Sequence, residues 1–273
     1  MTAPCQGSVK SDRIGAPRAA ADLRREGGDI SWERDVVRSW QEDQIHALQA
    51  IQNEHKLFVA LTALARNLGF DHCAYGLRMP LPLSEPRIVM FNNYPILWQV
   101  RYQKENYLAV DPTVQHGMRS LLPIVWSDDV FNSARDFWED ARSFGLQIGW
   151  AQSCRDANGV GGMLTLARSG EPLTKAELDD KGLRVAWLTH VAHLGMSRCL
   201  TAKLMPEGEE KLTPREVEVL RWTAEGKTSA QIAEILRIAE RTVNFHIGNV
   251  MAKLNSANKT AAVVRAAMLG LLY

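Results

Sequence analysis

The C-terminal segment, residues 211–273, constrains the fold most because it carries complete helix-start signals at close spacing. The stretch 213–216 (TPRE) places a hydroxyl at the N-cap, proline at the first helical position and a carboxylate three residues on, which is a capping box. The stretch 228–231 (TSAQ) repeats the capping box directly after Gly226-Lys227, where the preceding helix stops. Two short helices joined by a glycine turn and followed by a third indicate a helix-turn-helix that binds DNA.

The third helix, expected over residues 240–254, has an apolar and a polar side. Helical geometry places Val243, Ile247, Val250 and Leu254 together, facing the core. Phe245 falls on the opposite side, where it could contact a thymine methyl group in the major groove. The alternative is that Phe245 packs against a neighbouring helix or subunit.

The polar side of this helix supplies the predicted DNA contacts. We predict base-edge contacts from Asn244, Phe245, Gly248 and Asn249. We predict phosphate contacts, which are independent of sequence, from Thr228, Arg241, Thr242 and Lys253. Residues 211–273 hold nine basic and five acidic side chains, so this segment is positive while the rest of the chain is slightly negative. A charge of this size permits DNA binding without indicating it.

This tail resembles the DNA-binding domain of the LuxR (GerE-like) transcription regulators. The resemblance rests on LTPREVEVLRWTAEGK, IAEIL and RTVNFHIGNVMAKL, in which Glu216, Leu220 and Gly226 occupy characteristic positions of the family. The sequence departs from the family at Ala239, where serine is common, and loss of that cap should cost about 1 kcal/mol. The family also implies that the last helix, 258–272, pairs two subunits on a two-fold symmetric DNA site, and that the bound protein contacts RNA polymerase.

The composition of the whole chain excludes several protein classes. Its 273 residues are 46% hydrophobic and suffice for about two domains. No apolar run approaches the roughly 18 residues of a membrane span, and no secretory leader is evident, so we expect a cytoplasmic protein without a membrane partner. The four scattered cysteines show no metal or redox spacing, so we expect no cofactor and no metal.

Compositional shifts divide the chain into four segments. Residues 1–35 are rich in Ala, Arg and Gly and lack periodicity, so we expect a disordered extension. Residues 36–204 form the predicted sensor domain, 205–211 (MPEGEEK) the linker, and 212–273 the helix-turn-helix domain.

The sensor segment alternates helical and strand patterns, which predicts an α+β fold: an α/β/α sandwich with a central antiparallel sheet, followed by an all-α four-helix domain. Helices are expected at 44–68, 94–106, 111–119, 128–143 and, after a second TxxE capping box, 174–203. Strands are expected at 72–79, 87–91, 122–126, 149–155 and 161–167. The turn 156–159 (DANG) predicts that the last two strands pair as a hairpin.

Aromatic and polar residues concentrate between residues 94 and 126. Tyr94, Trp98 and Tyr102 recur at helical spacing, Asp111 precedes a proline, and Trp126 ends an expected strand. Taken singly, each is more often ordinary packing or a turn. Together, the spacing Tyr-x3-Trp, Asp-Pro and Trp resembles the acyl-homoserine lactone pocket of quorum-sensing LuxR proteins, and the resemblance spans about residues 40–273.

The resemblance implies a role for each pocket residue. Trp98 would donate to the lactone carbonyl and Tyr94 to the amide carbonyl, while Asp111 accepts the amide N–H. Trp126 would pack on the lactone ring. Tyr102, Thr113, Thr165 and Ala74 complete the predicted ligand-binding set. The chemistry suits a neutral signal, because indole donates only and a carboxylate accepts only. Since an unpaired buried carboxylate is costly, we expect the empty sensor to fold poorly.

Three alternatives remain beside a signal-gated transcription factor. A lactone-hydrolysing enzyme would need an activated nucleophile or a metal cluster, and His46, His55, His190 and His193 suggest ordinary packing instead, so we expect no enzyme. A phosphorylation-controlled receiver would need acidic residues after an early strand, whereas Asp128-Asp129 comes too late. The third alternative keeps the fold and changes the function, to a receptor for another small amide or a ligand-independent DNA-binding regulator.

Overall fold

A computed structural model describes residues 46–204 and 211–272, and each of these two parts is treated by itself. The predicted extension 1–35 and nearly all of the predicted linker lie outside the described residues. Among the described residues, no helix is long and apolar enough to span a bilayer.

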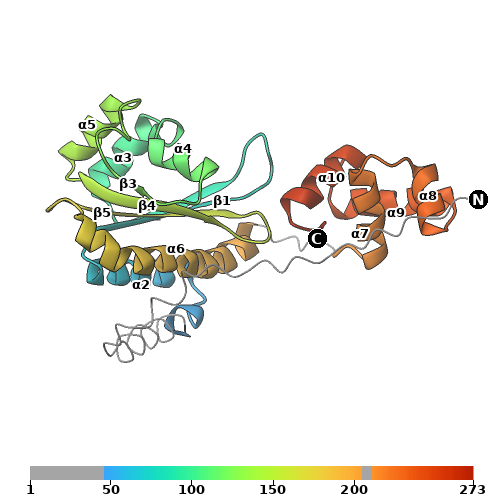
Figure 1. Cartoon of the computed structure of the whole chain (residues 1–273), viewed down its shortest axis with the longest axis horizontal. Coiled ribbons are helices and arrows are strands. Elements are labelled where there is room, and N and C mark those ends of the chain that lie inside the picture. Colours follow the sequence, from blue (N-terminus) through green and yellow to red (C-terminus); the bar gives the residue numbers. More distant parts are fainter. Residues whose placement is uncertain (1–45, 205–210, 273) are drawn as a thin grey trace, which may run out of the picture. The chain divides into compact units, whose positions relative to one another are not determined.

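The 46–204 part is built on a five-stranded sheet with the order β2-β1-β5-β4-β3, in which every neighbouring pair is antiparallel. The strands are β1 (His72–Arg78), β2 (Ile88–Asn92), β3 (Ile124–Val125), β4 (Ile148–Arg155) and β5 (Gly161–Arg168). Figure 1 shows helices on both faces of this sheet. One face carries α2 (Glu54–Asn67) and α6 (Lys175–Leu204); the other carries α3 (Ile96–Lys104), η3 (Tyr107–Ala109), α4 (Pro112–Arg119) and α5 (Arg135–Ser143).

The predicted α/β/α sandwich is therefore confirmed. The predicted hairpin is also present, because β4 and β5 pair on either side of a turn that ends at Gly159 with φ of +75°. The Asp156 side chain supports this turn by accepting from the backbone N–H groups of Asn158 and Val160.

Two predicted helix boundaries were wrong, and one predicted capping box is incomplete. The single helix expected over 44–68 is interrupted, because Asn53 is extended and its side chain caps a new helix by accepting from the Lys56 N–H. The helix expected from 128 begins only at Arg135, after turns. The capping box expected at 174–177 is half formed: Thr174 accepts from the Glu177 N–H, but the Glu177 carboxylate instead binds Arg168 and Lys181.

The two faces of the sheet bury different kinds of core. On the α2/α6 face the core is mostly aliphatic, and its members include Leu57, Leu61, Leu164, Leu166, Leu188 and Met196. On the other face the core is aromatic, and its members include Trp98, Tyr107, Phe131, Phe137 and Trp138. Strand alternation assigns neighbouring residues to opposite faces, so that Tyr75 and Leu77 are fully buried beneath the helices while Gly76 faces the aromatic side.

The 211–272 part contains four helices, as predicted: α7 (Pro214–Ala224), α8 (Ser229–Leu236), α9 (Glu240–Lys253) and α10 (Lys259–Met268). Both predicted capping boxes form completely, at Thr213 with Glu216 and at Thr228 with Gln231. Ala239 starts α9 without a side-chain cap, as expected from the sequence. Val243, Val250 and Leu254 are buried, which confirms the core side of this helix.

Candidate functional site

A cavity lies against the aromatic side of the sheet, and residues of α3, η3 and α4 line it. All eight residues predicted to bind ligand line it: Ala74, Tyr94, Trp98, Tyr102, Asp111, Thr113, Trp126 and Thr165. The sheet register explains part of this convergence, because Ala74 and Ala151 flank Thr165 on adjacent strands and share its face. Ala74 and Thr165, which are 91 positions apart in the sequence, thus meet at one wall.

Asp111 is held rigidly as the N-cap of α4. Its Oδ1 atom accepts from the backbone N–H of Thr113 at 2.8 Å and from the Thr113 hydroxyl at 2.7 Å. Its Oδ2 atom accepts from the Tyr102 hydroxyl at 3.0 Å. Burial raises the pKa of Asp111, while these hydrogen bonds act in the opposite direction. Because each carboxylate oxygen can accept two hydrogen bonds, these three leave one acceptor position on Oδ2, and the backbone N–H of Val114 makes a smaller contribution to the carboxylate.

These contacts correct one expectation. Asp111 does not depend on a ligand for its hydrogen bonds, since Thr113 and Tyr102 already satisfy most of its capacity. The reason is that Asp111 also serves as a helix cap, a local role that any Asp-Pro-Thr sequence can fulfil. The empty domain therefore avoids the cost of an orphaned carboxylate.

Trp98 sits at the centre of the aromatic core and is only 2% exposed. Its ring stacks on Tyr107 and meets Tyr102 edge to face. Its indole N–H has no acceptor among the described residues, although the side chain lines the cavity. The indole is fixed by packing, while its donor remains available.

Tyr94 lines the same cavity but was wrongly placed on a helix. Pro95 is the N-cap of α3, and the residue before a proline is driven toward extended conformations, so Tyr94 precedes the helix. Burial is the main cause that raises the pKa of Tyr94 well above its ordinary value, so the phenol is neutral and able to donate. No described residue accepts from its hydroxyl. The Thr165 hydroxyl, 6% exposed on β5, also lacks a partner among the described residues.

Trp126 follows β3, which is shorter than predicted, and its backbone N–H donates to the Gly149 carbonyl. A Cβ atom at Gly149 would lie 2.3 Å from the indole of Trp126, so only glycine permits the ring to lie there. The Trp126 indole N–H is buried and has no hydrogen-bond partner among the described residues. Gly149 escaped the sequence reasoning because its importance follows from strand register.

Sequence reasoning missed further residues of the cavity wall. Gly117 brings α4 close to the sheet, since an added Cβ would lie 3.0 Å from the Met163 sulfur and 3.3 Å from Ser153. The only available sequence signal was a glycine inside a short helix, which often marks a close approach. Gly76, Arg78 and Met90 also line the cavity.

A second polar cluster lies on the opposite face of the sheet, beneath α6. The Tyr75 hydroxyl is 2.8 Å from His193 Nδ1, and the Ser197 hydroxyl donates to Asp156. Burial lowers the pKa of His193, and its Nε2 atom has no hydrogen-bond partner among the described residues. Across the described ranges, no three His, Cys, Asp or Glu side chains are grouped to hold a metal ion. This cluster ties the β4–β5 turn to α6.

In the 211–272 part, α9 exposes one side to solvent. Arg241, Asn244, Phe245 and Gly248 are exposed, with Phe245 at 62%, while Thr242 and Asn249 are half-buried. The Asn244 side-chain oxygen accepts from the Ser229 hydroxyl, which leaves its NH₂ group outward. Thr228 is exposed and caps α8.

Lys253, predicted to contact a phosphate, also makes contacts within the domain. Its ammonium group lies 2.9 Å from Glu216 Oε2 and also donates to the Lys211 carbonyl. Glu216 is 2% exposed, and the hydrogen bonds from Thr213 and Lys253 outweigh its burial and lower its pKa. The Lys253–Glu216 ion pair therefore fastens α9 to the start of α7.

Two family models match the chain. The autoinducer binding domain matches residues 53–196, and the model described as bacterial regulatory proteins, luxR family, matches residues 210–266. The chain belongs to the LuxR family of transcription regulators. It is 50% identical over 238 residues to the transcriptional activator protein AnoR of Acinetobacter nosocomialis, covering 86% of this chain and all of that protein.

Solved structures of LuxR-type proteins agree with the fold. A crystal structure of Escherichia coli SdiA is similar, with a TM-score of 0.75 and 33% identity, and covers 87% of this chain and 99% of that one. A structure of SdiA in complex with octanoyl-rac-glycerol has a TM-score of 0.74 at 34% identity, covering 87% and 97% of the two chains. This LuxR family member is thus a quorum-sensing transcription regulator with a signal-binding domain and a DNA-binding helix-turn-helix, and its relatives are not enzymes.

Proposed function

We propose that this LuxR family member binds an N-acyl-homoserine lactone in the cavity and then, as a dimer in the cytoplasm, binds a roughly palindromic promoter site. One observation carries the choice of ligand. Among the described residues, no acceptor engages the donors that the cavity gathers at Tyr94, Trp98 and Trp126, and these lie beside the Asp111 carboxylate with its one free acceptor position. A neutral ligand with two carbonyl groups and one amide N–H complements that set.

Each polar group then takes one part of the ligand. Trp98 donates to the lactone carbonyl and Tyr94 to the amide carbonyl, while the free position on Asp111 accepts the amide N–H. The lactone ring lies against Trp126, and the Thr165 hydroxyl serves as a further partner near the amide. Tyr102 and Thr113 act through Asp111, because both already donate to it.

A buried carboxylate gives this site its selectivity for the amide. A hydrogen bond to a charged group contributes about 1.5–3 kcal/mol, and an ester in place of the amide would lose it. The relative SdiA has been solved with octanoyl-rac-glycerol, an acyl ester without that N–H. A neutral acyl ester is therefore the competing ligand class.

The DNA-binding half of the proposal rests on α9. Asn244, Phe245, Gly248 and Asn249 contact base edges, and Thr228, Arg241 and Thr242 contact phosphates. Lys253 acts indirectly, through its ion pair with Glu216. Two copies related by two-fold symmetry would present two such helices, with Val264 on the exposed side of α10 available for pairing. Contact with RNA polymerase belongs to the same proposal.

Mass spectrometry of ligand extracted from the purified full-length protein tests the lactone assignment directly. The host should be fed equal amounts of an acyl-homoserine lactone and the acylglycerol of the same chain length. We expect the lactone to be retained and to be required for binding to promoter DNA. Retention of the acylglycerol alone, with ligand-dependent DNA binding, would overturn the amide-specific assignment.

A further inference from the structure

The β1 strand presents Ala74, Gly76 and Arg78 to the cavity, because alternate residues of a strand share one face. The residues between them, including Tyr75 and Leu77, are buried beneath the helices on the other face. Along β1, the cavity wall therefore changes from the methyl group of Ala74 to the bare backbone of Gly76 and then to the guanidinium group of Arg78.

Gly76 lies between two methionines. The register pairs it with Met90 of β2 on one side and Met163 of β5 on the other, so all three residues face the cavity in one row. Gly76 thus lies at the bottom of a groove whose two sides are the Met90 and Met163 side chains. This groove is called the trough below. Methionine is flexible and polarizable, and such walls adapt to an alkyl chain.

The space above Gly76 is open, in contrast to that at Gly117 in the cavity wall and at Gly149 behind Trp126. A Cβ atom at Gly76 would meet no atom within 4 Å. A Cβ at Gly149 would collide with Trp126, and one at Gly117 would press on Met163. Close packing explains the last two glycines, whereas at Gly76 no protein atom requires the missing side chain.

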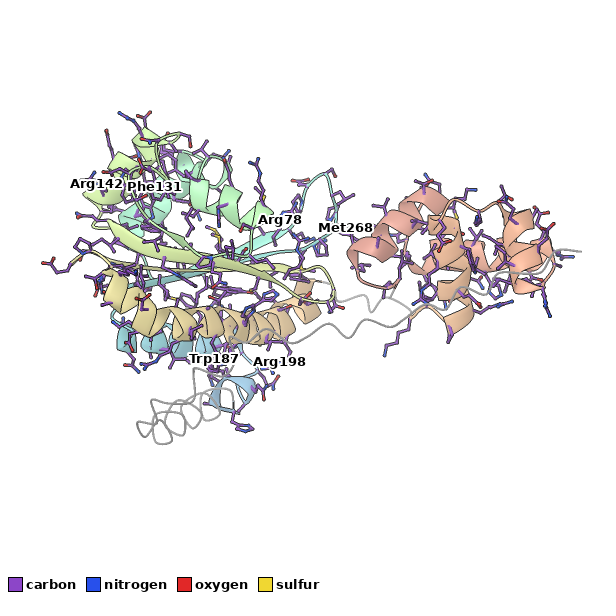
Figure 2. All side chains as sticks on the ribbon, viewed as in Figure 1. Arg78, Phe131, Arg142, Trp187, Arg198 and Met268 are labelled. Carbon is purple, nitrogen blue, oxygen red and sulfur yellow. The ribbon has the colours of Figure 1, made fainter. Side chains whose placement is uncertain are left out.

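Arg78 marks the far end of the trough. It lies two residues beyond Gly76 on β1. Gly161 of β5 pairs with Arg78 on one side and with Arg155 of β4 on the other, so two guanidinium side chains flank a glycine. Arg78 has no acidic partner among the described residues, and its side chain is half-buried. Figure 2 marks Arg78 toward one end of the sheet and Phe131 at the aromatic end. A guanidinium that keeps its head hydrated ends the apolar path.

The length of the trough sets the length of the chain it can hold. From Ala74, beside Thr165, to Arg78 is four residues of strand, or about 13 Å. An extended chain advances roughly 3.3–3.6 Å for every three bonds, so about eleven bonds cover that distance. Resting on the function proposed above, we propose that the ligand carries a linear acyl chain of about ten to twelve carbons that lies over Gly76 and ends at Arg78.

This arrangement predicts how affinity depends on chain length. Each methylene buried in the trough should raise affinity about fourfold. Methylenes beyond Arg78 would enter solvent and add nothing. Affinity should therefore rise steeply to a chain of ten to twelve carbons and then level off.

The experiment measures dissociation constants of full-length protein for two ligand series by quenching of tryptophan fluorescence. One series is unsubstituted acyl-homoserine lactones with even chains from four to sixteen carbons, and the other is the matching 1-acylglycerols. The test variant is Gly76→Val, which suits a strand and whose Cβ atom would meet no atom within 4 Å, with Gly76→Ala as a milder version. Gly170→Val is the matched control, because Gly170 is exposed and an added Cβ there also meets nothing.

We expect Gly76→Val to lose at least tenfold in affinity for twelve-carbon chains while keeping its affinity for four- and six-carbon chains, and Gly170→Val to match the wild type. Arg78→Ala should extend the rise in affinity to fourteen carbons or more. A wild-type optimum at four to six carbons, or an unchanged profile in Gly76→Val, would overturn the trough. A normal length profile in the acylglycerol series alone would overturn the lactone head group but support the trough, and binding in neither series would overturn both.

Discussion

The Tyr102 hydroxyl donates a 3.0 Å hydrogen bond to Asp111 Oδ2, so a residue of α3 completes the hydrogen bonding of the N-cap of α4. The same carboxylate thus joins two helices that line the cavity and offers its remaining acceptor position to the cavity. Structural and ligand-binding roles are combined in one side chain, and variants at residue 111 must separate them.

Asp111→Ala should lose both roles. Removal of the cap and of the acceptor for Tyr102 should destabilise the unliganded protein by about 1–3 kcal/mol. Asp111→Asn keeps an oxygen for the Thr113 N–H, so its thermal midpoint should lie nearer the wild type, yet lactone should stabilise it much less than it stabilises the wild type. Thermal denaturation with and without lactone measures both effects, and normal stabilisation of the Asn variant would contradict the assignment.

Ligand binding should weaken in acid. Burial raises the pKa of Asp111, and the protonated carboxyl is a poorer acceptor than the carboxylate. Affinity should therefore fall as pH drops through this raised pKa, and remain flat in Asp111→Asn. The unliganded protein should respond in the opposite sense at this group, because a folded-state pKa above the unfolded value means that ionisation costs stability as pH rises. Titration calorimetry between pH 4 and 7 would check the first trend; equal slopes in both proteins would refute it.

Gly149→Ala should disable the signal site without touching a hydrogen-bonding group. The added methyl would overlap the Trp126 indole, and relief by displacement typically costs about 1–3 kcal/mol. We expect reduced lactone affinity and an altered tryptophan emission maximum. Gly170→Ala, at an exposed position with open space, is the control. Wild-type affinity in Gly149→Ala would show that the position of Trp126 is unimportant.

The Arg168–Glu177 ion pair should govern part of the acid stability. Hydrogen bonds from Arg168, and then from Lys181, hold the pKa of Glu177 at about 2. The pKa of Glu177 in the folded protein thus lies below the value of about 4.3 expected for the unfolded chain. The ion pair therefore stabilises the fold fully above about pH 4.3, and this stabilisation is lost as the pH falls toward 2. Glu177→Gln should lower stability near neutral pH and flatten this part of the profile. Urea unfolding at several pH values would measure it, and an unchanged slope would argue against the pair.

On DNA, two exposed residues of α9 should behave differently. Phe245→Ala should leave folding stability within about 0.5 kcal/mol but cost about 1–3 kcal/mol of binding to the promoter site. Arg241→Ala should weaken binding to all sequences and reduce the salt dependence by about one phosphate contact. Fluorescence anisotropy with promoter and scrambled duplexes separates the two, and equal losses on both duplexes for Phe245→Ala would contradict base contact.

Local signals in the sequence predicted much of the fold. The caps at Thr213 and Thr228 act within one helical turn, so both helix starts were correct. The single helix expected over 44–68 was wrong because the Asn53 side chain caps a new helix. Helix propensity alone does not decide between a continuous helix and a new start at Asn53. Tyr94 was misplaced because a helical spacing of aromatics outweighed the effect of Pro95.

The sequence predicted which residues line the cavity, but it did not predict the contacts among them. All eight predicted residues line it, yet the Tyr102–Asp111 bond depends on how α3 meets α4, which no local pattern specifies. Likewise, the Lys253–Glu216 pair joins residues 37 positions apart, and no local pattern in the sequence specifies it. Gly149 and Gly76 acquire meaning only from the strand register.

The long helix α6 covers the face of the sheet that the ligand cannot reach. Its 30 residues form a rod about 45 Å long, and it ends next to the segment that leads to the DNA-binding domain. Thr165 points to the cavity while its neighbours Leu164 and Leu166 pack in the core on the α6 side. Consecutive residues of β5 therefore connect the cavity wall to the core beneath α6 through the thickness of a single sheet.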